Sequence, residues 1–251
     1  MKKFGIITAL FLLAALATGC GSANNDNVLK VGTEPTFPPF EYTDEKTGKI
    51  EGFDIALITA MAEKAGYKVE IVNVAFDGLI AALQSGNIDI AASGMSITPE
   101  REESVNFTDP YIDAGLTIAV PGTNKDINGE ADLKGKIVGV QIGTTGADKA
   151  NELKQSGQVK DVKTYNTIDV AFLDMLNGAI DGIINDGPVN EAYMSKNTAK
   201  IKIVGSVLAS DQYGFAVAKG NTKLTEELNK ALQELKDDGT YDKLVAEYFG
   251  Q

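Results

Sequence analysis

The chain has no histidine and only one cysteine among its 251 residues. The absence of histidine excludes imidazole acid–base catalysis, Ser-His-Asp triads and His-ligated metal sites. Basic residues are also scarce, because 23 Lys and Arg stand against 35 Asp and Glu, which gives a formal net charge of -12. Such an acidic chain is a poor partner for the phosphate backbone of nucleic acids. We therefore expect no nucleic-acid partner, no metal and no cofactor.

Nucleotide-binding loops are missing as well. The chain contains no GxxxxGK[ST] loop, and Gly139 to Gly146 has the spacing GxxxGxxG, which differs from the dinucleotide fingerprint. What remains is a medium-sized acidic protein, long enough for two modest hydrophobic cores.

The N-terminal residues have the parts of a secretory signal. Two lysines precede an apolar run from Phe4 to Leu16, and small residues continue to Cys20. The run is too short for a permanent transmembrane helix. Cys20 resembles the lipobox cysteine of bacterial lipoproteins, which is diacylated (for example with palmitate) after cleavage, although the usual Leu three positions earlier is Ala17 here. The alternative is a buried apolar cysteine.

A polar stretch after this cysteine favours the anchor, because residues 21–27 are typical of a flexible tether. We expect residues 1–20 to be a lipoprotein signal peptide and the mature protein to be extracytoplasmic and lipid-anchored to the bacterial cell membrane. No other cysteine remains, so the protein needs no disulfide there.

Apolar periodicity predicts two βαβαβ units. The first has strands at 28–32, 69–74 and 88–92 and helices at 52–65 and 76–84. The second has strands at 137–140, 162–165 and 182–184 and helices at 145–155 and 167–176. Segments 111–120 and 212–218 are expected to cross between the units, and helices are expected at 222–236 and 241–249.

Such units form parallel sheets with helices on both faces, and ligands bind beyond the carboxyl ends of the strands. The predicted fold is therefore α/β, with two Rossmann-like lobes, two crossing segments and a ligand cleft between the lobes. Lobe 1 is expected at 28–113 and 212–251, and lobe 2 at 114–211.

The segment from Ser93 to Arg101 indicates an anion site. It ends an apolar strand in small residues, which allow close approach to the main chain, and it supplies a guanidinium that can bind a carboxylate with two parallel hydrogen bonds. The alternative is an ordinary helix start, with Thr98 as N-cap and Pro99 as the first helical residue.

Taken together, the motifs resemble those of the polar amino-acid solute-binding proteins of bacterial ABC importers, which have a type II periplasmic-binding-protein fold. The resemblance covers Val28 to Gly250. It rests on residues 32–42 (GTEPTFPPFEY), 52–54 (GFD), 93–101 (SGMSITPER), 107–111 (FTDPY), 139–145 (GVQIGTT) and 238–241 (DGTY).

The resemblance implies how an amino acid would be held. Arg101 would bind the α-carboxylate, with backbone donors at Ser96 and Thr145, the latter at a predicted helix start that favours an anion. Asp186 would bind the α-ammonium, aided by the Gly94 carbonyl and the Ser96 hydroxyl. Both ligand charges need partners, since burial removes their water. Ser93 lies on the same rim.

Several of these residues have structural alternatives. Asp186 could cap a helix that begins at Gly187 and Pro188, and Thr144 and Thr145 could simply start a helix, which is compatible with ligand binding. Phe37 and Phe76 could be core residues. Their positions directly after strands favour cleft walls that sandwich the ligand side chain.

Glu34 carries the prediction of ligand identity, because relatives place an acidic group at this position. A carboxylate there would repel an acidic ligand side chain and attract a guanidinium, ammonium or amide. Gln141 would face it without adding positive charge. We expect a polar or basic ligand, with arginine, lysine, histidine or glutamine as candidates and cystine as a further one.

The resemblance implies a binding protein, not an enzyme, that closes around its ligand by hinging at 113–116 and 208–212. Its partners would be a free L-amino acid, an ABC permease with its ATPase, and the membrane through the lipid anchor only; we expect a monomer. Two alternatives stay open. One is a dehydratase on cyclic amino-acid precursors, with Glu34 or Asp186 as general acid. The other is an amino-acid sensor.

Overall fold

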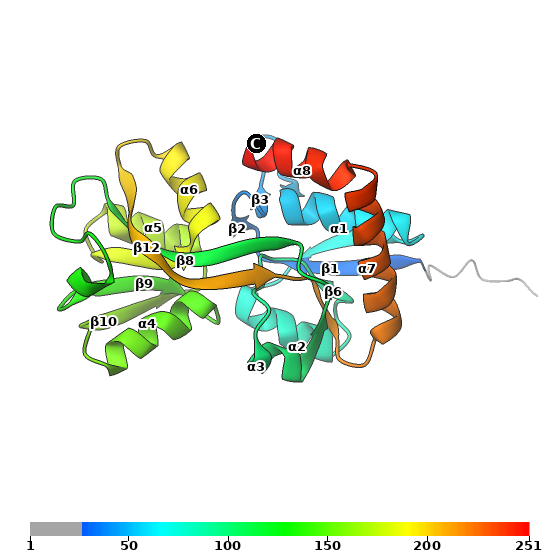
Figure 1. Ribbon diagram of the computed structural model, residues 1–251, viewed down its shortest axis with the longest axis horizontal. Coiled ribbons are helices and arrows are strands. Elements are labelled where there is room, and N and C mark those ends of the chain that lie inside the picture. The colour runs from blue at the N-terminus through cyan, green and yellow to red at the C-terminus, as the bar shows by residue number, and fades with distance from the viewer. Residues whose placement is uncertain (1–26, 251) are drawn as a thin grey trace, which may run out of the picture.

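Two five-stranded sheets, lying side by side, organise residues 27–250, which are the residues that this computed structural model describes (Figure 1). Cys20 and the predicted signal segment lie outside the described residues. None of the helices within 27–250 combines the length and apolarity that crossing a membrane requires. The predicted α/β class with two lobes is confirmed.

The lobe 1 sheet has the order β5-β1-β6-β13-β7. Its strands are β5 (Lys68–Asn73), β1 (Val28–Thr33), β6 (Ile90–Ala91), β13 (Ala216–Ala218) and β7 (Val105–Phe107). β1 pairs in parallel with β5 and β6, whereas β13 is antiparallel to its neighbours. The helical elements of this lobe are α1 (Phe53–Lys64), η1 (Phe76–Gly78), α2 (Leu79–Gln84), α3 (Pro99–Ser104), α7 (Thr222–Asp237) and α8 (Thr240–Phe249).

A small antiparallel sheet of β2 (Thr36–Phe37), β3 (Glu41–Thr43) and β4 (Ile50–Glu51) follows β1. The periodicity predicts no strand in this stretch, because strands of two or three residues are too short to show alternation. The sheet brings residues 34–41 back over the end of β1.

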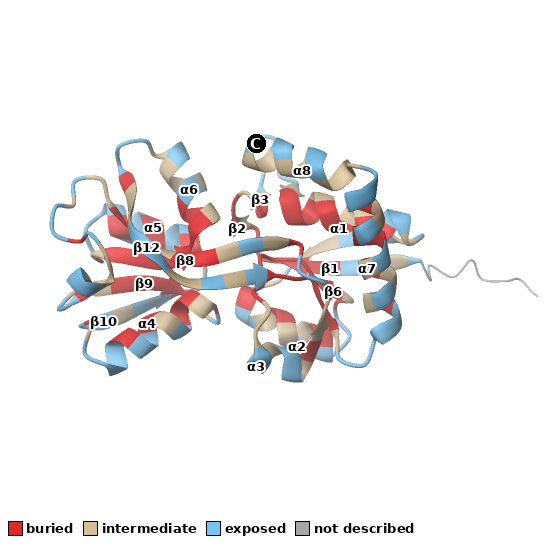
Figure 2. Ribbon diagram, in the orientation of Figure 1, coloured by how far each residue is buried: buried red, intermediate tan, exposed pale blue. Residues whose placement is uncertain are grey.

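The lobe 2 sheet has the order β10-β9-β11-β8-β12. Its strands are β10 (Asp161–Tyr165), β9 (Ile137–Gln141), β11 (Gly182–Asp186), β8 (Ile112–Pro121) and β12 (Ile201–Tyr213). Its helical elements are η2 (Glu130–Leu133), α4 (Thr145–Gln155), α5 (Ile168–Leu176) and α6 (Gly187–Lys196). The inner strands β9, β11 and β8 are mostly buried, whereas the edge strands β10 and β12 are more exposed (Figure 2).

The prediction for the second crossing segment was wrong in extent. The sequence predicts one strand at 212–218, but β12 begins at Ile201 and ends at Tyr213, and a separate strand, β13, begins at Ala216. β12 is an edge strand with a register shift between Val204 and Ala209, so it shows no regular alternation. Apolar periodicity did not predict helix α6, because only Gly187, Val189 and Asn190 of it are buried and no apolar stripe marks it. A helix beginning at Gly187 was considered only as the alternative role of Asp186.

β8 and β12 connect the lobes as an antiparallel pair (Figure 1). Their register pairs Leu116 with Ala209 and Asp113 with Gln212. The two segments expected to hinge therefore lie side by side. That they hinge, and that the lobe boundaries fall at 113/114 and 211/212, stays a prediction.

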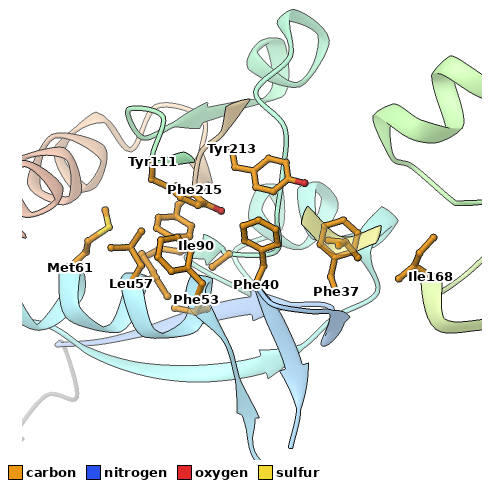
Figure 3. Close-up of a cluster of buried hydrophobic side chains, with 14 of the residues drawn as sticks. Phe37, Phe40, Phe53, Leu57, Met61, Ile90, Tyr111, Ile168, Tyr213 and Phe215 are labelled. Atoms are coloured by element: carbon orange, nitrogen blue, oxygen red, sulfur yellow. The ribbon is translucent and has the colours of Figure 1, made fainter. Parts of the chain in front are cut away.

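An aromatic cluster supports the cavity side of lobe 1 (Figure 3). Phe40 packs edge-on against Tyr213 with ring centroids 5.1 Å apart, and Tyr111 stacks on Phe215 at 4.4 Å. Phe37 lies between this cluster and Ile168 of lobe 2 (Figure 3). Large interlocked rings restrict one another, so this part of lobe 1 provides a firm base for polar groups above it.

Candidate functional site

One cavity lies between the lobes, where strand ends of both sheets meet. It encloses about 280 Å³ of space between atoms, its opening to solvent included. The residues that line it are Glu34, Phe37, Glu41, Phe76, Ser93, Gly94, Ser96, Arg101, Gln141, Thr144, Thr145 and Asp186. The structure thus brings together all eleven residues expected to bind the ligand, although their contact with a ligand stays a prediction.

The segment from Ser93 to Arg101 starts a helix and also supplies a guanidinium to the cavity. Thr98 is the N-cap of α3 and accepts a hydrogen bond from the Arg101 backbone N–H at 3.2 Å, so the helix-start interpretation is confirmed. The guanidinium nevertheless turns to the cavity, where Nη1 donates to the Ser96 carbonyl at 2.7 Å and Nη2 donates to the Gly143 carbonyl at 2.9 Å. It therefore contacts both lobes and has N–H groups to spare.

Aromatic rings line the walls. The Arg101 guanidinium carbon lies 5.5 Å from the centroid of Phe76, close enough for a cation–π interaction. Phe37 and Phe76 are 6% and 8% exposed and also pack against hydrophobic neighbours. Each is both a core residue and a cavity wall.

Gly94 is required where the main chain meets the Phe37 ring. Its φ is +51°, and a Cβ at this position would lie 2.9 Å from that ring. Its N–H donates to Asp54 Oδ2 at 2.8 Å, which also accepts from the Tyr111 hydroxyl at 2.7 Å. Burial raises the pKa of Asp54 to about 6.

In lobe 2, the start of α4 presents Thr144 and Thr145 to the cavity. Thr144 is the N-cap: its Oγ1 accepts from the Ala147 N–H at 3.1 Å and donates to the Gln141 carbonyl at 2.8 Å. The helix-start interpretation is confirmed here too. The free N–H groups of the first turn make this end of α4 favourable for an anion.

Asp186 ends β11 and occupies the N-cap position of α6, but its side chain makes no capping hydrogen bond. The capping interpretation is therefore wrong. The carboxylate is 4% exposed, and its Oδ1 has no hydrogen-bond partner among the described residues. Burial raises the pKa of Asp186 to about 7; the nearby Tyr213 hydroxyl opposes this rise, Asp211 adds to it and Arg101 opposes it. A buried carboxylate with an oxygen that lacks a hydrogen-bond partner is suited to a cationic partner.

Glu34 is held from both lobes. Its Oε2 accepts from Thr36 Oγ1 at 2.7 Å and from Gln141 Nε2, across the cavity, at 3.1 Å. Burial raises the pKa of Glu34, and these two hydrogen bonds counter part of that rise. Gln141 faces Glu34, as the sequence predicts.

Glu41 is the lining residue that the sequence did not single out. It is fully buried, its Oε1 accepts from Ser93 Oγ at 3.0 Å, and its Oε2 has no partner among the described residues. Burial, with the charge of Asp54 next, raises the pKa of Glu41 well above its ordinary value. Ser93 Oγ also accepts from the Glu34 N–H at 3.0 Å. The only feature of the sequence that could have indicated Glu41 was its position at the end of the motif Pro-Pro-Phe-Glu, on the same rim as Glu34.

The lining contains three carboxylates, those of Glu34, Glu41 and Asp186, and a single guanidinium. This excess of negative charge favours a ligand that carries at least one positive group. No group of three or more His, Cys, Asp or Glu placed to hold a metal occurs within 27–250.

A further contact joins the lobes. The Tyr193 hydroxyl of α6 donates to the Thr36 carbonyl of β2 at 3.0 Å. Tyr193 also stacks on Phe172, with centroids 3.9 Å apart and rings inclined by 15°. Arg101, Gln141 and Tyr193 thus each donate a hydrogen bond from one lobe to the other.

Comparison with known proteins supports the geometry. The family model described as bacterial extracellular solute-binding proteins, family 3, matches residues 29–251. The chain is 37% identical to ABC transporter arginine-binding protein 1 of Escherichia coli (strain K12), covering all of both chains. Two solved structures, an ancestral arginine-binding protein bound to arginine and one bound to glutamine, are each 46% identical. They superpose with TM-scores of 0.85 and 0.84 over 89% and 90% of this chain and 98% and 99% of theirs.

Proposed function

This chain belongs to the bacterial extracellular solute-binding proteins of family 3, and on that premise we propose that it binds a free polar or basic L-amino acid between its lobes and delivers it to the permease of an ABC importer. One observation carries the proposal: Arg101 of lobe 1 and Asp186 of lobe 2 line the same cavity. Opposite charges contributed by different lobes match the two charges that every free amino acid carries.

Arg101 binds the α-carboxylate. Two of its N–H groups already position the guanidinium against the Ser96 and Gly143 carbonyls, and others remain for the ligand. The backbone donors at Ser96 and at the start of α4 complete the anion site. Asp186, with its unpartnered oxygen, binds the α-ammonium, together with the Gly94 carbonyl and the Ser96 hydroxyl.

Glu34 and Gln141 bind the far end of the ligand side chain between Phe37 and Phe76. Glu34 supplies negative charge and Gln141 supplies an amide, so arginine, lysine, histidine and glutamine fit and glutamate and aspartate do not. The similarity to proteins solved with arginine and with glutamine supports this choice.

Ligand binding closes the lobes about β8 and β12. Arg101 of lobe 1 and Asp186 of lobe 2 can contact the ligand at the same time only when the lobes are closed. The ligand therefore stabilises the closed form over an open one. The permease recognises the closed form. The mature protein works outside the cytoplasm as a monomer held to the membrane by lipid on Cys20.

Isothermal calorimetry against the twenty amino acids tests the function. We expect one or more of arginine, lysine, histidine and glutamine to bind with micromolar or tighter affinity. Mass spectrometry of small molecules that co-purify with the protein gives an independent identification. Tight binding of glutamate, with no binding of arginine or glutamine, would contradict the role of Glu34.

Catalysis is the second candidate, because the raised pKa of Asp186, about 7 through burial, also suits a general acid. We favour binding, since Asp186 has the ammonium as its partner and the sequence relatives are binding proteins. Incubation with prephenate or arogenate separates the two. Formation of an aromatic product, followed by its absorbance, would support a dehydratase.

A further inference from the structure

Asp211 is a carboxylate beside the site that does not line the cavity. It lies on β12, where this strand crosses between the lobes. Its Oδ2 accepts hydrogen bonds from Thr145 Oγ1 at 2.9 Å and from Ser96 Oγ at 3.2 Å. Thr145 begins α4 in lobe 2, and Ser96 precedes α3 in lobe 1. One oxygen of the crossing strand therefore holds a hydroxyl from each lobe.

These hydrogen bonds determine what the two hydroxyls present to the cavity. A Ser or Thr hydroxyl has a single proton and two lone pairs. The protons of Ser96 and Thr145 are directed to Asp211, so their oxygens, 3.5 Å apart, face the cavity with lone pairs. These lone pairs attract the α-ammonium, whereas the backbone N–H groups of the same two residues serve the α-carboxylate. Asp211 thus determines that these two hydroxyls act as acceptors, although Asp211 itself does not contact the ligand.

We infer that Asp211 is a positioning residue for the α-ammonium of the bound amino acid: it orients the Ser96 and Thr145 hydroxyls as acceptors beside Asp186. The inference rests on the proposed function. Its three groups come from lobe 1, lobe 2 and the crossing strand, so the arrangement is complete only when the lobes are closed.

The test compares two ligands that differ only in the α-ammonium. L-Arginine has it, and 5-guanidinopentanoate lacks it while keeping the guanidinium and the carboxylate. We expect Asp211→Ala to weaken binding of L-arginine about 10- to 30-fold, the range for losing charge-assisted hydrogen bonds, and to change binding of the analogue less than about 2-fold. Asp211→Asn keeps an acceptor oxygen but adds an NH₂ donor, so its effect on L-arginine is intermediate.

Asp44→Ala is the control. Asp44 lies in the turn between β3 and β4, away from the crossing strands, and its Oδ1 accepts from Thr47 Oγ1 at 2.7 Å. This variant also removes a carboxylate that accepts from a hydroxyl, and it touches neither Ser96 nor Thr145. Both ligands are expected to bind it within about 2-fold of the parent.

Equal weakening of both ligands by Asp211→Ala, or no weakening of either, overturns the inference. Thermal unfolding without ligand checks folding, and if the alanine variant is unfolded, Asp211→Asn carries the same comparison. Should the parent bind L-glutamine instead of L-arginine, the pair becomes L-glutamine and 5-amino-5-oxopentanoate. A parent protein that binds none of the twenty amino acids refutes the proposed function itself, which is a different result from a parent that binds and variants that do not discriminate.

Discussion

The two lobes contribute to the cavity in different ways. In lobe 1 the buried acids have partners within the lobe: Ser93 donates to Glu41, and Gly94 and Tyr111 donate to Asp54. The aromatic cluster lies below them (Figure 3). In lobe 2 one core cluster is aliphatic, and Phe172 and Tyr193 stack elsewhere in the lobe. Among its lining groups, Thr144 bonds within the lobe, Gln141 bonds across the cavity, and Asp186 leaves an oxygen unpartnered.

This difference shows which groups respond to closure. Glu41 and Asp54 keep their hydrogen bonds within lobe 1, although one oxygen of each has no partner among the described residues. Arg101 and Gln141 hydrogen-bond across the cavity, and Asp186 leaves an oxygen for a ligand. Since unsatisfied buried groups are costly, the free energy of closure should depend mainly on groups that reach across the cavity.

The largest effect is expected at Arg101, the lobe 1 side chain that hydrogen-bonds a lobe 2 carbonyl. Arg101→Lys keeps the charge but cannot reproduce the planar fork that binds a carboxylate and two carbonyls. We expect the affinity for L-arginine to fall about 100-fold, or about 3 kcal/mol, by calorimetry. Lys223→Arg, at an exposed position on α7, is the charge-conserving control. Binding by the Arg101 variant within a factor of two of the parent would contradict the carboxylate assignment.

The next effect concerns Asp186, whose pKa of about 7 in the ligand-free protein is raised by burial. Since only the ionised carboxylate pairs with an ammonium, affinity for L-arginine should rise from pH 5.5 to pH 8, by up to about tenfold per unit below that pKa. Asp186→Asn should bind about 30-fold more weakly at pH 8 and show a smaller slope. Calorimetry across this range measures both, and an unchanged slope in the variant would exclude Asp186 as the titrating partner.

The raised pKa of Asp186 also leads to a prediction for the ligand-free protein. A carboxyl whose pKa is higher in the folded than in the unfolded state stabilises the fold at low pH, and this contribution is lost as the pH rises through the folded-state value. Unfolding temperature should therefore decrease between pH 5 and pH 8. Asp186→Asn should reduce this decrease. Exposed acids with lowered pKa values, such as Asp161 and Asp174, titrate below this window.

A smaller effect is expected at Tyr193, which donates from lobe 2 to the Thr36 carbonyl of lobe 1. Tyr193→Phe keeps the stacking on Phe172 and removes one hydrogen bond between the lobes, so affinity should fall about 3- to 10-fold. Tyr67→Phe is the matched control, because its hydroxyl bonds Glu227 within lobe 1. If both variants lowered affinity equally, the loss of affinity could not be attributed to the hydrogen bond between the lobes.

The smallest effect is expected at Glu41, whose hydrogen bond to Ser93 lies within lobe 1. Glu41→Gln removes a buried carboxylate with a raised pKa and leaves an oxygen that can accept from Ser93. We expect the unfolding temperature at pH 7.5 to rise by about 2–4 °C and affinity to change less than about 3-fold. Glu70→Gln, exposed on β5, should leave both unchanged. A lower unfolding temperature would mean that the carboxylate stabilises lobe 1.

Much of the fold was predictable because its signals are local. The helix expected at 145–155 begins and ends where predicted, with Thr144 as its N-cap, and Thr98 caps α3. The inner parallel strands β1, β9 and β11 contain runs of buried residues, and the alternation of β5 predicts a strand. β12 and α6 were missed because an irregular edge strand and a helix without an apolar stripe have no local pattern.

The sequence alone determined which residue types stand at the ends of the strands, since capping and periodicity act over a few neighbouring residues. It placed Glu34, Arg101, Gln141 and Asp186 on rims of the two sheets. Only the tertiary structure decided which of these side chains form hydrogen bonds with one another. Gln141 reaches Glu34 across 107 residues of chain, and Ser96 reaches Asp211 across 115. Such meetings depend on how the two lobes pack and on the course of β12 between them, so Glu41 and Asp211 could be recognised only in the folded protein.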